Sequence, residues 1–116
     1  GPAMGDTVQA VKNHVFCNPL TDPGEADITS HVDFAPFRNI TYQNDLSPLG
    51  PVPQNLFLQR IGIDQRYAIL DQNCSASQHD ELYHAYRRLM DADQMGTLFQ
   101  AFAIHSPAIR PGGFAQ

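Results

Sequence analysis

Four residues with ionisable side chains lie within nine positions of the chain, at Glu25, Asp27, His31 and Asp33. Residues 26–32 alternate in polarity, which predicts an extended segment with Asp27, His31 and Asp33 on one face. Such a row of acids can hold a guanidinium group through paired, charge-assisted hydrogen bonds. The same acids can instead serve the fold, because Asp33 precedes a short helix and Asp27 follows a loop. From the residues alone, the structural role is favoured.

A second group, His79 and His84 with Asp80 and Glu81, contains residue types that bind metal ions. A zinc-binding pair on a helix places its histidines four residues apart. These two are five residues apart, which is about 140° around a helix axis. The acids suit the positive end of a helix dipole. The group is therefore interpreted as the solvated start of a helix, and no metal site is predicted.

Cys17 and Cys74 are the only cysteines, and their spacing fits neither a disulfide framework nor a metal motif. His14 lies three residues before Cys17, but closeness in sequence does not orient a base toward a thiol. Cys74 lies in a polar loop without a base nearby in sequence. Both are expected to be ordinary reduced thiols, and no catalytic residue is identified.

The net charge of the chain indicates which classes of binding partner it can have. The chain has 7 Lys and Arg residues against 12 Asp and Glu residues, for a net charge of −5. That balance argues against nucleic acid or an acidic membrane as partner, since both need concentrated positive charge. It is compatible with a basic substrate, such as an arginine-bearing protein segment. No apolar run approaches the roughly 20 residues that span a bilayer, and no signal-peptide pattern is found.

The local patterns predict short elements joined by loops, with 9 prolines and 8 glycines in 116 residues. Helices are expected over 6–11, 34–38, 53–61, 64–71 and 77–90, strands over 26–32 and 97–104, and a loop over 41–51. The last strand is expected to be buried on both faces, since Phe99, Phe102 and Ile104 cannot share one. Residues 106–116 are expected to be a flexible tail, and residues 1–4 an expression remnant.

The predicted fold class is α/β or α+β, with several short helices packed on a small sheet that includes the strand near 97–104. Four ordered stretches then suggest a relationship. The chain resembles the C-terminal part of the MidA family of S-adenosylmethionine-dependent methyltransferases in the stretches GDTVQA (5–10) with NPLTDPG (18–24), PGEADITSHVDF (23–34), GPVPQNLFLQRIGI (50–63) and MGTLFQAFAI (95–104).

The resemblance implies a partial class I methyltransferase architecture, a Rossmann-like sheet with helical additions, in which residues 97–104 form a late antiparallel strand. It implies transfer of a methyl group to an arginine nitrogen of a protein. The family includes a mitochondrial enzyme that acts in the assembly of respiratory complex I. Glu25, Asp27, His31 and Asp33 fall in a characteristic family stretch and become substrate-binding candidates, while catalytic residues stay unknown.

The chain also departs from the family, because the glycine-rich loop and the ribose-binding acid lie upstream of the residues present. No cofactor-binding residue is therefore assigned, and S-adenosylmethionine is not expected to bind this chain tightly. Residues 5–105 are expected to form a single C-terminal region that is inactive alone. Its partners would be the protein substrate or the missing N-terminal half.

The alternative is a small, non-catalytic binding or assembly module derived from the same family. The expected location is the cytoplasm if the chain is bacterial and the mitochondrial matrix if it is eukaryotic.

Overall fold

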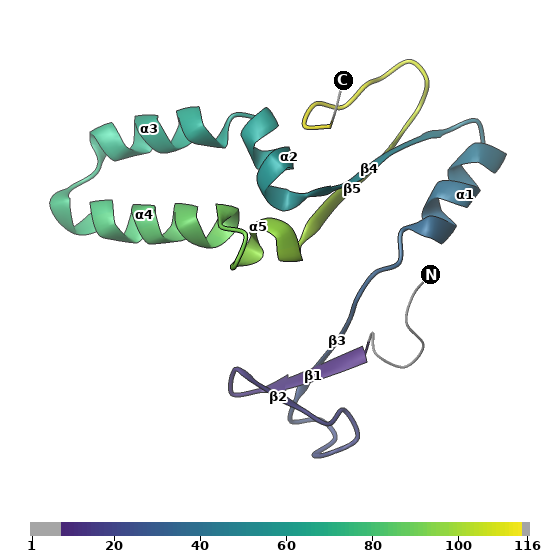
Figure 1. The fold of residues 1–116 in the computed structure, drawn as a ribbon, viewed down its shortest axis with the longest axis horizontal. Helices are drawn as coiled ribbons and strands as arrows, with labels where there is room; N and C mark the ends of the chain where they lie inside the picture. Colours follow the sequence, from purple (N-terminus) through teal and green to yellow (C-terminus); the bar gives the residue numbers. More distant parts are fainter. Residues whose placement is uncertain (1–7, 115–116) are drawn as a thin grey trace. The chain divides into compact units, whose positions relative to one another are not determined.

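The computed structural model describes residues 8–114. The chain divides into two compact units, one ending at Pro36 and one beginning at Phe37. The elements, shown in Figure 1, are β1 (Val8–Lys12), β2 (Val15–Cys17), β3 (Asp27–Ser30), α1 (Ala35–Gln43), β4 (Ser47–Pro53), α2 (Gln54–Arg60), α3 (Ile63–Asn73), α4 (Ala76–Met90), α5 (Met95–Leu98) and β5 (Gln100–His105). This mixture of short helices and small antiparallel sheets confirms the predicted fold class.

The first unit is a three-stranded antiparallel sheet with β1 in the centre and the order β2-β1-β3. Asn13 and His14 connect β1 to β2 with φ angles of 51° and 63°. Two left-handed residues in a two-residue turn match the twist of a hairpin. The helix predicted over 6–11 is wrong for its described residues 8–11, which pair with both neighbouring strands. Residues 6 and 7 of that prediction lie outside the described residues.

Few side chains of this sheet are buried. Ala10 is fully buried at the centre of β1, opposite Cys17 on one side and Ile28 on the other. By contrast, Phe16 is 72% exposed and Ile28 is 64% exposed. The extended segment predicted over 26–32 is present as β3, although its apolar side chains remain open to solvent.

The helix predicted over 34–38 is present as α1 and continues to Gln43. Pro36 does not stop it, because the proline lies in the first turn, where no helical N–H is needed. Thr41 is 1% exposed, and its hydroxyl donates a hydrogen bond of 2.6 Å to the Arg38 carbonyl.

The loop predicted over 41–51 is wrong, because its second half forms β4, which pairs with β5. Gly50 lies at an irregularity in this pairing, and the Gly50–Pro51 peptide bond is cis. A Cβ atom at Gly50 would lie 2.7 Å from the Ala101 carbonyl oxygen. Prolines and a glycine made this segment look like a loop, but glycine also permits the close approach of two strands.

The strand predicted over 97–104 begins at Gln100, because Met95–Leu98 form the short helix α5. The expectation of burial on both faces is wrong for this chain: Ile104 is 46% exposed. An antiparallel pair of only two strands has too few neighbours to cover both of its faces.

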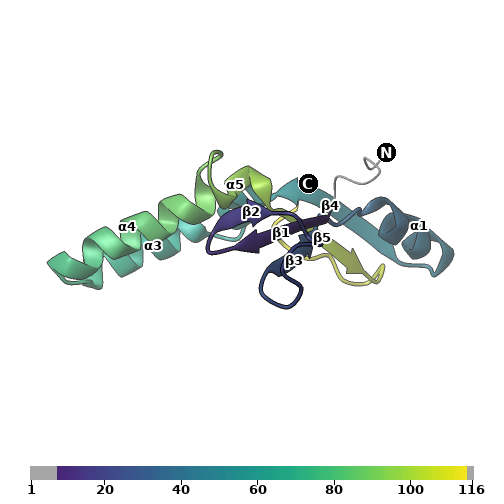
Figure 2. The ribbon, with the colours of Figure 1, turned by 90° about the horizontal axis from the view of Figure 1, so that it is seen from below.

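Helices α3 and α4 lie side by side and run in opposite directions, as the two views in Figures 1 and 2 show. We call this pair the helical arm (residues 63–90). Gly62 precedes α3 with a φ of 101°, a left-handed conformation that glycine adopts without strain. The start of α4 is fixed by Ser75 and not by Ser77: the Ser75 hydroxyl accepts from the Gln78 amide, and the Gln78 side chain accepts from the Ser75 amide.

Contacts from α2 and the final segment fix the base of the arm. The Gln54 side-chain amide donates to the Leu89 carbonyl at 3.0 Å, near the end of α4. Gly113 lies against the Phe57 ring, and Phe114 packs on the same ring with a centroid distance of 5.4 Å. Part of the segment expected to be a flexible tail therefore contacts α2. None of the helices within residues 8–114 is both long and apolar enough to cross a membrane.

Candidate functional site

The four substrate-binding candidates do not converge on one point. The Glu25 carboxylate lies 2.9 Å from Lys12 Nζ, and Asp22 lies 3.2 Å from the same atom. These two hydrogen bonds, that of Glu25 first, raise the pKa of Lys12. Asp33 accepts a hydrogen bond of 3.0 Å from the backbone N–H of Ala35 at the start of α1. Glu25 and Asp33 therefore have structural partners of their own.

Asp27 and His31 are placed differently. The register pairs Gln9 with Thr29 and Val11 with Asp27, so these side chains share one face of the β1–β3 pair. Gln9 Nε2 and His31 Nε2 lie 3.3 Å apart. Asp27 makes no hydrogen bond or ion pair with the residues that the structure describes. The result is a small, exposed polar face with a carboxylate available to accept hydrogen bonds from a guanidinium group.

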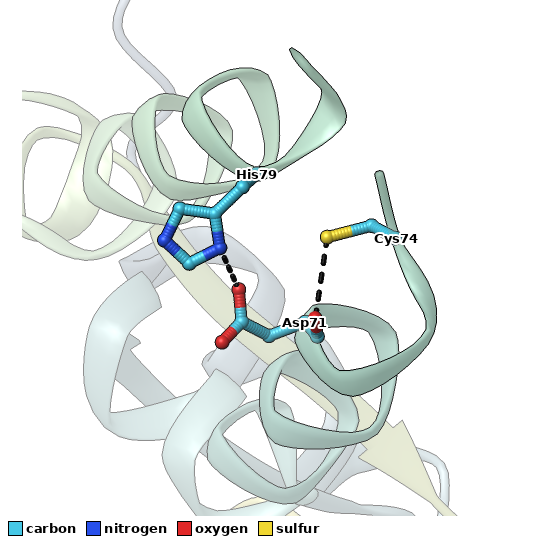
Figure 3. Close-up of side chains that lie close together, drawn as sticks. All are labelled: Asp71, Cys74 and His79. Atoms are coloured by element: carbon cyan, nitrogen blue, oxygen red, sulfur yellow. Dashed lines mark hydrogen bonds and ion pairs between the residues drawn. The ribbon is translucent and has the colours of Figure 1, made fainter. Parts of the chain in front are cut away.

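A different group of side chains does converge, and the sequence did not single it out as a group. Asp71, Cys74 and His79 each offer one ligand atom, and these atoms all lie within 4.8 Å of one another. Among residues 8–114, this is the group of three or more His, Cys, Asp or Glu side chains that meets that criterion. Figure 3 shows the three residues around the turn from α3 to α4. The sequence instead groups His79 with His84, Asp80 and Glu81, and it shows no base close to Cys74 along the chain.

The sequence does contain a pattern that could have indicated this group: Asp-x₂-Cys-x₄-His, formed by Asp71, Cys74 and His79 across the break between two predicted helices. It becomes informative only once the two helices are known to fold back on each other. His79 Nδ1 lies 2.5 Å from Asp71 Oδ1 as an ion pair, and the Cys74 thiol donates to the Asp71 carbonyl at 3.3 Å. The side chains of Asp71 and His79 are 32% and 53% exposed, so solvent reaches the group.

Two tyrosines hold the helical arm together. The Tyr86 hydroxyl donates a hydrogen bond of 2.7 Å to Asp64 Oδ1, and the Tyr86 ring stacks at 4.7 Å on that of Tyr67. The hydrogen bond to Asp64 is the main cause that raises the pKa of Tyr86, with burial second. Burial raises the pKa of Tyr67, and the negative charge of Asp71 adds to the effect. These contacts join α3 to α4 across the arm.

The described glycines do not form a cradle for a methyl donor. Such a loop lies between a parallel strand and a helix, whereas all the strand pairs within residues 8–114 are antiparallel. Gly50, Gly96 and Gly113 are explained by close packing, because a Cβ atom at each would lie within 3 Å of neighbouring atoms. Gly62 forms the turn between α2 and α3. These residues therefore do not fit the donor-binding loop, and no step of methyl transfer is assigned to them.

Comparison with known proteins shows which family the chain resembles. Residues 2–52 match the family model described as "Putative S-adenosyl-L-methionine-dependent methyltransferase". The mitochondrial protein arginine methyltransferase NDUFAF7 of Xenopus laevis is 39% identical over 100 residues, which are 85% of this chain and 23% of that protein. The chain thus spans about a quarter of the length of the curated relatives it matches.

Solved structures agree with the sequence comparisons. A crystal structure of an uncharacterized protein from Burkholderia thailandensis has a TM-score of 0.79 at 27% identity, covering 95% of this chain and 30% of that one. A second crystal structure from the same superfamily and organism, bound to S-adenosyl-homocysteine, has a TM-score of 0.76 at 27% identity and covers 90% of this chain and 27% of that one. S-adenosylmethionine is the methyl donor of the family that these proteins represent. Together these comparisons support a fragment of the MidA family of S-adenosylmethionine-dependent methyltransferases, matching part of its longer members.

Proposed function

We propose that this chain is the substrate-side part of a methyltransferase that transfers a methyl group from S-adenosylmethionine to an arginine nitrogen of a protein. One observation carries the proposal: 85% of the chain matches a protein arginine methyltransferase at 39% identity but accounts for only 23% of it. On this proposal, other residues supply the donor-binding loop. The chain alone then has no methyltransferase activity and does not bind the donor tightly.

The exposed apolar side chains support a larger surrounding fold. Within the sheet of residues 8–36, large apolar side chains are more than half exposed, namely Val8, Val15, Phe16, Leu20, Ile28 and Val32. Across the described residues, the buried apolar side chains are Ala10 and Met90. A folded domain of ordinary composition covers far more of its apolar surface than this. Further strands and helices of a complete methyltransferase would cover these faces.

Within this proposal, Asp27 and His31 are the substrate-binding residues. Their shared face is exposed, and the Asp27 carboxylate has both oxygens free of partners among the described residues. A carboxylate that accepts hydrogen bonds from a guanidinium group holds it in a defined plane. Orienting the accepting nitrogen toward the methyl group is a large part of what such an enzyme must do. Glu25 and Asp33 instead shape the loop and the helix that flank this face.

The first test uses the purified chain by itself. Amide proton–nitrogen correlation spectra are recorded with and without excess S-adenosylmethionine, and methyl transfer to an arginine-bearing protein is assayed in parallel. We expect no turnover and no shifted resonances. Turnover, or specific shifts in residues 8–33, would overturn the proposal that the donor site lies outside this chain.

The second test restores the missing part. Residues 5–105 replace the matching segment of the frog arginine methyltransferase, and the Asp27→Asn variant of this chimera is compared with Asp45→Asn. We expect Asp27→Asn to raise the KM for the protein substrate by about tenfold or more, as for the loss of a charged hydrogen bond, with an unchanged KM for S-adenosylmethionine. Asp45 is exposed with a φ of 54°, which asparagine tolerates, so that variant should behave as the parent. Equal kinetics of the two variants would remove Asp27 from the substrate site.

A non-catalytic binding module remains the competing proposal. It requires a chain that is complete in itself, whereas the exposed sheet side chains favour a piece of a larger fold. A monodisperse chain that unfolds cooperatively would favour the module. Self-association through the sheet would favour the substrate-side part.

A further inference from the structure

We propose that Asp71, Cys74 and His79 form a binding site for a divalent zinc-type cation at the turn of the helical arm, with three protein ligands and a fourth position open to solvent. This proposal is independent of the methyl-transfer function. It rests on the ligand atoms of the three side chains, which lie within 4.8 Å of one another.

The turn between α3 and α4 fixes the three residues in place. Asp71 belongs to the last turn of α3, Cys74 follows that helix directly, and His79 lies in the first turns of α4. The reciprocal hydrogen bonds of Ser75 and Gln78 fix where α4 begins. The three ligands therefore come from rigid helix ends, which position metal ligands more accurately than a long loop does.

One atom of this group, in the Asp71 carboxylate, lacks a hydrogen-bond partner among the described residues. Asp71 Oδ1 is buried and has no hydrogen-bond partner among the described residues, although His79 Nδ1 lies 2.5 Å away as an ion pair. In a tetrahedral zinc site, bond lengths of about 2.0–2.2 Å place two such ligand atoms about 3.3 Å apart. The pair must therefore open by less than about 1 Å, which a rotation of the half-exposed His79 ring can supply (Figure 3).

The donor set selects the class of ion. A thiolate, an imidazole and a carboxylate are the ligands that zinc takes, whereas magnesium and calcium prefer oxygen alone. Thiolate and carboxylate together balance the charge of a divalent ion. Three protein ligands with access to water leave the fourth position to a solvent molecule.

A simpler arrangement would be an ion pair between Asp71 and His79 that joins the two helices. That arrangement does not involve the sulfur of Cys74, which in this structure only donates to the Asp71 carbonyl. The contribution of Cys74 to metal binding therefore separates the two possibilities.

The experiment titrates the reduced chain with Zn²⁺ in competition with a chromophoric chelator, and with Co²⁺ as a spectroscopic substitute. We expect one equivalent to bind, and the cobalt form to show a thiolate-to-metal charge-transfer band together with the visible bands of a four-coordinate ion. A cobalt complex without the thiolate band would overturn the proposal, because Cys74 would then not be a ligand.

Variants complete the test. We expect zinc affinity to fall by at least about tenfold in each of three variants, Cys74→Ser, His79→Gln and Asp71→Asn. Replacing a residue that only hydrogen-bonds to a metal ligand already lowers metal affinity by about tenfold or more. The matched controls are the other cysteine, Cys17→Ser, and the other histidine of α4, His84→Gln, which should bind as the parent does. Amide spectra of the metal-free variants establish that each is folded. Unchanged affinity in Cys74→Ser, or equal loss in Cys17→Ser, would overturn the site.

Discussion

The sheet of residues 8–36 and the helical arm of residues 63–90 reach their structures by different routes. Each helix of the arm begins at a local signal: Gly62 before α3 and the Ser75 capping box before α4. The hydrogen bond between Tyr86 and Asp64 then joins the pair. The sheet has a clear register but only Ala10 as a buried apolar side chain, with Phe16 72% exposed. Local interactions specify the arm, whereas the sheet leaves most of its apolar side chains exposed.

The largest expected effect is at the base of the arm. In Gly96→Ala, the new Cβ atom would lie 2.1 Å from the Met90 carbonyl oxygen, and backbone atoms cannot rotate away as a side chain can. We expect a loss of about 3 kcal/mol in the free energy of unfolding, measured by urea denaturation. The control is Gly112→Ala, where a Cβ atom would meet nothing within 4 Å. Equal stability of the two variants would contradict the packing at Gly96.

Removing the helix cap tests whether the arm is specified locally. Ser75→Ala deletes the hydroxyl that accepts from the Gln78 amide, and we expect a loss of about 1 kcal/mol in the free energy of unfolding. Ser77→Ala, at the first residue of the helix predicted from the sequence, should change stability by less than about 0.5 kcal/mol. Thermal denaturation followed by circular dichroism distinguishes the two. If Ser77→Ala lost more stability than Ser75→Ala, α4 would begin two residues later than the structure shows.

The link between α3 and α4 should depend on pH. Tyr86→Phe removes the hydrogen bond to Asp64 and should cost about 1 kcal/mol near neutral pH. The pKa of Tyr86 is raised above 10.0 in the folded chain, so its contribution is complete below pH 10 and is lost as the pH rises further. The stability difference between parent and variant should therefore shrink above pH 10. Tyr42→Phe, at a side chain 64% exposed, serves as the control and should show no such change.

The smallest effect on stability is expected for a substitution in the sheet. The same substitution should clearly reduce self-association. Phe16→Ser changes a side chain that is 72% exposed, so the free energy of unfolding should change by less than about 0.5 kcal/mol. Self-association, measured by sedimentation over a range of concentrations, should fall. The matched variant Ile69→Ser removes an apolar side chain 53% exposed on α3. If both variants reduce association equally, the contrast between sheet and arm fails.

The sequence predicts best where local chemistry decides the structure. The positions of α2, α3 and α4 follow from apolar periodicity and from Gly62, and the structure contains all three. The strand over 8–12 was missed because its turn, Asn13-His14, lacks the glycine that usually marks a tight hairpin. The strand over 47–53 was missed because its prolines and Gly50 are typical of loops, and only its pairing with β5 makes it a strand.

The candidate sites show the same limit. Alternation predicted the shared face of Asp27 and His31, and the structural role expected for Asp33 before a helix fits its hydrogen bond with the Ala35 N–H. Sequence could not show that Lys12 forms an ion pair with Glu25. The group of Asp71, Cys74 and His79 depends on how two helices fold back on each other. Spacing along one helix, the criterion applied to His79, cannot detect ligands that come from two.

The crossing of the chain over α2 at Gly113 gives a marker for reading other sequences. This residue has a φ of 92°, and a Cβ atom would lie 2.5 Å from the Phe57 ring, so two independent restrictions favour glycine over every other amino acid. Any chain that folds its final segment back in this way must place a glycine there and an aromatic or similarly large residue on the helix beneath it. A sequence that has the four matching stretches but another residue at this position is expected to end along a different path.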